Sequence, residues 1–159
     1  MPGEPFQVRA SIMRPANTNQ YTAKDVVNGS VAEPMRFRWI TPFPGMGYWI
    51  LSPVMISSNA PTTTGNFLLL LFSQRPTTPI DHAVFAPEDS EMSYLIGVVS
   101  FDKAVKVSTG TIYVPSAFSP IWGQCLANTQ DIFGVLLDDA AYTPASTETY
   151  NVILNGQWE

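Results

Sequence analysis

Fourteen prolines are distributed along the 159 residues, from Pro2 to Pro144, and they constrain the fold more than any other feature of the sequence. Proline lacks a backbone N–H and its ring clashes with the preceding helical turn, so this spacing leaves little room for long helices. The segments between the prolines are rich in β-branched and aromatic residues, which favour strands. The sequence therefore predicts an all-β domain of short strands and turns.

The most apolar run is residues 67–72, which lie between turn-forming segments. Its length and flanks predict a buried strand rather than a helix. Alternating side chains give it two apolar faces: Phe67, Leu69 and Leu71 on one, Leu68, Leu70 and Phe72 on the other. A sandwich interior covers only one of them. The second face needs either the 76–93 segment or a neighbouring subunit as its cover, and we favour the subunit.

Further strands are predicted at 7–13, 35–41, 48–58, 95–101, 131–137 and 147–158, and residues 105–107 and 111–114 are predicted to form either a hairpin or one bent strand. The total of about eight strands with long connections favours a two-sheet antiparallel jelly-roll sandwich. An immunoglobulin-like sandwich of seven strands is the alternative. Pro53 predicts an edge position or a bulge within its strand. Residues 1–6 are predicted to form a flexible N-terminal arm, followed by one jelly-roll domain over residues 7–159.

Charged residues make up 13% of the chain, about half the usual ~25%, and the net charge is −5. Because only eight lysines and arginines are present and they are scattered, we expect no direct binding to nucleic acid or to an anionic membrane. The first residues lack the features of a signal peptide, and no apolar run approaches the ~20 residues of a membrane span. These features predict a product of the cytoplasm that packs within an assembly.

Catalytic chemistry finds little support in the sequence. His82 is the only histidine and Cys125 the only cysteine, so neither a histidine- nor a cysteine-based metal site is expected. No nucleophile motif accompanies His82, which we interpret as a loop residue bonded to its neighbours. Acidic residues at 88–91 and 138–139 fit helix starts and turns as well as calcium ligation. We predict no enzyme activity, no cofactor and no metal.

Four tryptophans are candidates for recognition: Trp39, Trp49, Trp122 and Trp158. Three lie in predicted strands, where packing in the core is the expected role. Trp122 lies in a predicted loop and is the best candidate for an exposed anchor, which could stack on a sugar or grip a protein partner.

Three stretches together resemble a known family. Residues 14–27, Arg-Pro-Ala-Asn-Thr-Asn-Gln-Tyr-Thr-Ala-Lys-Asp-Val-Val, resemble an opening that recurs in small structural proteins of tailed bacteriophages. Residues 67–97 resemble the middle section of those proteins, and residues 141–154 resemble their closing strand. The order of the stretches is the same and they cover most of the chain. The chain departs from the family at residues 42–46 and in its N-terminal arm.

The resemblance implies a decoration or cement protein of the bacteriophage head with a jelly-roll fold. Such proteins bind the outer surface of an HK97-type capsid, bridge neighbouring major capsid subunits and stabilise the DNA-filled shell. The expected partners are the major capsid protein and further copies of the chain, as a homodimer or homotrimer, and the expected location is the virion surface. The alternative is a carbohydrate-binding or host-adhesion module on the head or a fibre, with a host glycan as partner.

Loop length, the two-faced strand and the resemblance select the candidate contact residues for capsid or subunit. They are Phe6, Gln7, Arg14, Tyr21, Asp25, Leu68, Leu70, Phe72, His82, Phe85 and Trp122.

Overall fold

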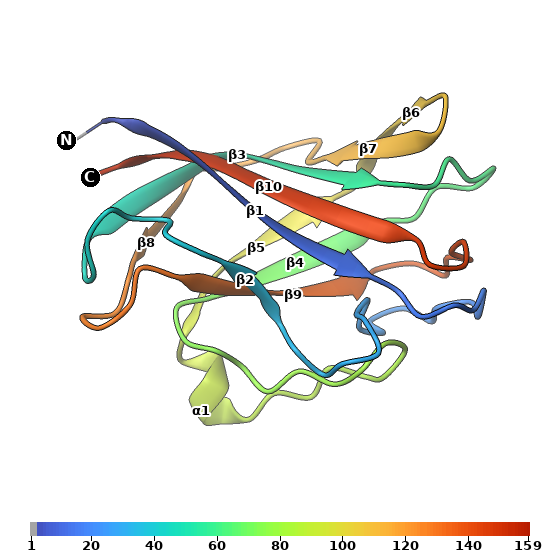
Figure 1. The fold of residues 1–159 in the computed structure, drawn as a ribbon, viewed down its shortest axis with the longest axis horizontal. Helices are drawn as coiled ribbons and strands as arrows, with labels where there is room; N and C mark the ends of the chain where they lie inside the picture. The colour runs from blue at the N-terminus through green and yellow to red at the C-terminus, as the bar shows by residue number, and fades with distance from the viewer. Residues whose placement is uncertain (1–2) are drawn as a thin grey trace.

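The computed structural model describes residues 3–159, which form a sandwich of two antiparallel sheets (Figure 1). The larger sheet has the order β1 (Pro5–Met13), β10 (Thr149–Trp158), β3 (Gly47–Ser57), β7 (Gly110–Val114) and β6 (Lys103–Val107), and β8 (Ile121–Gln124) also pairs with β3. The smaller sheet has the order β2 (Met35–Phe37), β9 (Ile132–Asp138), β4 (Phe67–Phe72) and β5 (Leu95–Phe101). The helix α1 spans only Asp89–Met92. Among residues 3–159, no helix is long and apolar enough to span a membrane.

The strands pair in the nested order of a jelly roll. β1 pairs with β10, β2 with β9, β3 with β8 and β4 with β5, each in antiparallel register. The predicted jelly-roll sandwich is thereby confirmed, but its eighth strand is β8, which was predicted as a loop, and residues 105–114 lie outside these eight strands. The other two strands, β6 and β7, form a hairpin inserted between β5 and β8 that extends the larger sheet beside β3.

The run of residues 67–72 is confirmed as a strand, β4, which lies between β9 and β5 in the smaller sheet. Phe67, Leu69 and Leu71 face the sandwich interior and are fully buried. The ring of Phe67 makes edge-to-face contacts with three tyrosines, at centroid distances of 5.1 Å to Tyr113, 5.6 Å to Tyr142 and 5.4 Å to Tyr150. Such pairs add to the area they bury, so Phe67 ties β4 to the larger sheet.

Pro53 lies in the middle of β3, which is an internal strand rather than an edge strand. On one side β3 pairs with β8 through residues 47–50 and with β7 through residues 55–57. Pro53 falls between the two partners, where no ladder needs its missing N–H. On the other side, Pro53 pairs in register with Leu154, and the register with β10 shifts between Asn155 and Gly156, opposite Leu51 rather than Pro53.

The predicted arm is shorter than expected, because β1 begins at Pro5. Phe6 packs edge-to-face on Tyr48 at 6.4 Å, and the Gly3 amide donates to the Trp158 carbonyl at 2.7 Å. Pairing with β10 therefore orders residues that the sequence assigned to the arm. Residues 1–2 lie outside the described part of the chain.

Two tryptophans differ from their predicted places. Trp39 was expected in a strand, but β2 ends at Phe37 and Trp39 is 70% exposed with a φ of 53°. The cause is Asp131, whose carboxylate accepts the Trp39 amide at 2.9 Å and the Arg36 side chain at 2.7 Å, and so fixes a turn. Trp122 lies in β8, directly opposite Trp49 of β3, rather than in a loop.

Candidate functional site

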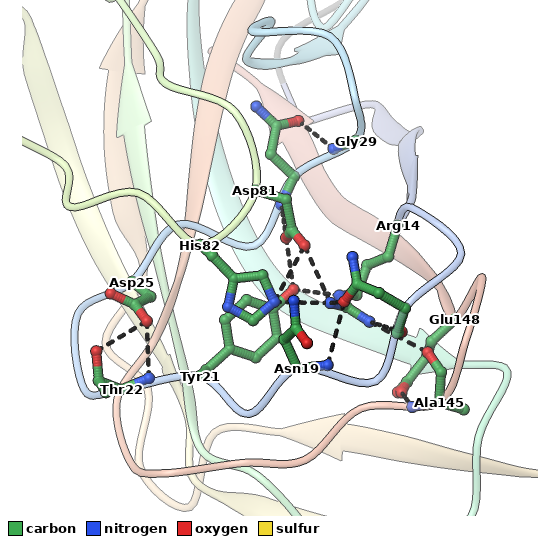
Figure 2. Close-up of polar contacts among 12 residues, drawn as sticks. Arg14, Asn19, Tyr21, Thr22, Asp25, Gly29, Asp81, His82, Ala145 and Glu148 are labelled. Carbon is green, nitrogen blue, oxygen red and sulfur yellow. Dashed lines mark hydrogen bonds and ion pairs between the residues drawn. The ribbon is translucent and has the colours of Figure 1, made fainter.

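Three predicted site residues, Arg14, Tyr21 and His82, meet around the buried Asp81, which was not predicted; these four residues are called here the loop cluster (Figure 2). The Asp81 carboxylate accepts from Arg14 Nη2 at 3.0 Å and from the Tyr21 hydroxyl at 2.6 Å. The Arg14 Nε also donates to the Tyr21 hydroxyl. The loop cluster thus joins the 14–25 stretch to the 76–93 segment through a closed set of polar contacts.

Burial sets the electrostatics of the loop cluster. The Arg14 and Asp81 side chains are 0% and 4% exposed, so each charge depends on the other. Burial alone lowers the pKa of Arg14, but Tyr21 and Asp81 reverse this and raise it overall. Burial and the Asp81 carboxylate raise the pKa of Tyr21 well above its usual value. The phenol is therefore neutral and donates its proton to Asp81.

His82 completes the loop cluster as a packing residue. Its Nε2 lies 2.9 Å from Arg14 Nη2, which can only donate, so Nε2 is the acceptor of the imidazole. The ring stacks on Tyr21 at 4.2 Å, and His82 has a φ of 66°. The interpretation of His82 as a loop residue bonded to its neighbours agrees with this geometry.

The loop cluster also makes hydrogen bonds to residues 141–154, the third of the three stretches compared with the bacteriophage proteins. Arg14 Nη1 donates to the Ala145 carbonyl at 3.1 Å, and the Tyr21 amide donates to the Tyr142 carbonyl at 2.8 Å. Asp25 is buried as well, and its carboxylate accepts the Thr22 amide at 2.7 Å. Arg14, Tyr21 and Asp25 are therefore structural residues, and their burial removes them from the candidate contact surface.

The outer face of β4 is covered in part by the chain itself. Phe72 is fully buried beneath Phe85 of the 76–93 segment, with 6.2 Å between ring centroids, and Val26 joins them. The expectation that a neighbouring subunit covers this whole face is thus wrong at Phe72. Leu68 and Leu70 remain half-buried, and Val98, opposite Leu70 on β5, is 48% exposed. An aliphatic strip is left open on the smaller sheet.

The larger sheet carries a second aliphatic strip on its own outer face. Ile56 of β3, Ile112 of β7 and Val105 of β6 lie directly opposite one another across three strands. Val105 and Val107 are each 47% exposed. Phe6 and Gln7 lie further along this sheet, and the Gln7 side chain bonds to Asn155 at 2.8 Å. This strip was not predicted from the sequence, because the apolar alternation in β6 covers only five residues and these include Lys103 and Lys106.

Two further carboxylates are buried and were also missed. Glu148 accepts from the Tyr142 hydroxyl at 3.0 Å and from the Ala145 amide at 2.8 Å, and from Ser57. Asp138 is fully buried, and neither of its oxygens makes a full hydrogen bond within residues 3–159. The pKa of Asp138 is raised to about 7, chiefly by burial; the Ala140 amide lowers this pKa, Asp25 raises it and Lys24 lowers it.

A shallow groove of about 340 Å³ lies where the edges of the two sheets meet, between β5 and β8. Trp122 is one of the lining residues and is 47% exposed, as the sequence predicted for an anchor residue. The other lining residues were not predicted as site residues, and they are Ser73, Ser93, Tyr94, Leu95, Ile96, Gly123 and Gln124. The only local signal for Tyr94 in the sequence is that an aromatic residue directly precedes the predicted strand 95–101.

Within residues 3–159, no three histidine, cysteine, aspartate or glutamate side chains gather into a group that could hold a metal ion. Comparison with known proteins found no family model that matches the chain and no curated relative.

Proposed function

We propose that the protein is a decoration protein of a bacteriophage head, which binds the outer capsid surface and bridges neighbouring major capsid subunits. The observation that carries this proposal is the pair of exposed aliphatic strips on opposite sides of the sandwich, around Val98 on the smaller sheet and around Val105 on the larger one. Exposed apolar patches mark interaction surfaces, and a bridging protein needs at least two of them.

Two further features support the proposal. The chain has half the usual share of charged residues, which suits a surface buried in an assembly. The three stretches that resemble bacteriophage structural proteins converge on the loop cluster, so they would serve a shared fold rather than a shared contact surface. Self-association into a dimer or trimer through one strip would leave the other strip for the capsid.

The test uses purified protein and expanded heads of the bacteriophage that encodes it, with occupancy measured by cosedimentation. Val98→Asp and Val105→Asp are each expected to lower occupancy about tenfold or more, because a buried charge replaces an apolar contact. Val31→Asp is the matched control, since Val31 is 62% exposed in the connection before β2 and lies on neither strip. Light scattering of the same variants identifies the strip used for self-association. Absence of the protein from purified virions, or unchanged occupancy in both variants, would refute the proposal.

A further inference from the structure

We infer that the groove between β5 and β8 is a binding site for a neutral saccharide. Its walls come from the end of β4, the junction of α1 with β5, and β8. This site is separate from the two aliphatic strips and does not depend on the proposed function. It gives the protein a second binding activity on the exposed edge of the sandwich.

Both aromatic residues of the groove are accessible, and the Trp122 indole is held in place. Trp122 is 47% and Tyr94 is 38% exposed. The Trp122 Nε1 donates to the Glu159 carboxylate at 2.7 Å, and the residue lies opposite Trp49 across β8 and β3. The indole is therefore fixed before a ligand arrives, which lowers the entropy lost on binding. A fixed ring with an electron-rich face can accept the C–H face of a pyranose.

The polar groups of the groove have free capacity for hydroxyl groups. Gln124 donates one amide proton to the Gly45 carbonyl at 2.8 Å, which orients the side chain and leaves its oxygen as an acceptor. Ser73 and Ser93 place hydroxyls on the same wall, where each can still accept a hydrogen bond. Aromatic surface with a few oriented polar groups is the usual composition of a small-ligand site.

The charge of the groove selects the class of ligand. None of its lining residues is charged, although the chain has 21 charged side chains from eight basic and thirteen acidic residues. The nearest carboxylate described above, Glu159, is occupied by the Trp122 indole. Anionic sugars would find no cation here, and cationic ligands would find no free carboxylate on the walls. A neutral sugar would bind in the groove without burying an unpaired charge.

β8 approaches β5 closely at Ile121 and Gly97, next in sequence to the groove-lining residues Trp122 and Ile96. A Cβ at Gly97 would lie 2.9 Å from the Ile121 side chain, so any larger residue there would force that side chain to shift. This geometry makes the site a property of the fold rather than of a mobile loop.

The experiment is a titration of the purified protein, without heads, against neutral maltose, cellulose and N-acetylglucosamine oligomers, followed by tryptophan fluorescence and calorimetry. We expect binding of at least one oligomer, and about tenfold or greater weakening in Trp122→Ala and in Gln124→Ala. Trp39→Ala is the matched control, because Trp39 is the more exposed tryptophan and lies outside the groove.

Thermal unfolding of each variant separates lost binding from lost folding, and Gln124→Ala keeps the test valid if Trp122→Ala unfolds. No binding of any neutral oligomer, preferred binding of sialylated or sulfated oligomers, or equal loss in Trp39→Ala would overturn the inference. Head occupancy is measured separately, so failure here leaves the decoration proposal standing, and failure there leaves this site standing.

Discussion

The loop cluster and the β5–β8 groove show two opposite uses of polar and aromatic side chains. In the loop cluster, Arg14, Tyr21 and Asp81 are buried and satisfy one another. In the groove, Trp122 and Gln124 are exposed, oriented and only partly satisfied. A closed polar network has nothing left to offer a ligand, whereas an open one does. The contrast separates residues that hold the fold from residues that are free to bind.

The largest effect is expected from breaking the loop cluster with Asp81→Asn. This change leaves the Arg14 guanidinium buried without its counter-charge and should cost about 3–5 kcal/mol of unfolding free energy. Urea unfolding measures it. Asp139→Asn is the control, because the exposed Lys24–Asp139 pair should contribute only about 0–1 kcal/mol. Equal losses in the two variants would show that the loop cluster contributes no more than a surface pair.

A smaller effect of opposite sign is expected from Asp138→Asn, which tests a buried carboxylate outside the loop cluster. The pKa of Asp138 is raised from 3.8 to about 7 in the folded state, so its protonated form favours folding below about pH 4 and this contribution is lost as the pH rises through 7. The variant should nearly match the wild type at pH 4, below which the contribution is complete, and exceed it at pH 8 by on the order of 2–4 kcal/mol. Thermal melts at both pH values measure the difference, and a pH-independent difference would contradict the raised pKa.

The smallest effects on stability are expected on the exposed strips and in the groove. Val98→Asp, Val105→Asp and Gln124→Ala should each change the unfolding free energy by about 1 kcal/mol or less, because Val98 and Val105 are only half-buried and Gln124 is exposed. Their expected effects are on head occupancy or on saccharide binding. If one of these substitutions unfolds the protein, the residue at that position stabilises the fold and is not only a binding residue.

The sequence predicted the sandwich because strand alternation and proline spacing are local signals. The burial of Phe67, Leu69 and Leu71 followed from a period of two. The loop cluster was beyond reach, since Arg14 and Asp81 are 67 residues apart and nothing nearby marks them as partners. Arg14 and Tyr21 were therefore predicted as surface contacts, although the fold buries them.

The same limit explains the error at Trp39. Its alternation with Met35 and Phe37 fits a strand, but a carboxylate 92 residues later in the chain turns the backbone outward. The exposed anchor at Trp122 was predicted because the residue lies among turn formers. The groove beside it needed the packing of β5 on β8, which no local pattern encodes.

The nested strand order has a consequence for how the protein is made. β10 lies between β1 and β3, so the larger sheet cannot close until residues 149–158 have left the ribosome. Until then β1 and β3 expose unpaired edges on a growing chain, a state that is prone to aggregate. Contacts between the first and last strands also slow folding, because a long loop must close before they form. Synthesis rate and chaperone supply, rather than final stability, should therefore limit the yield of native protein.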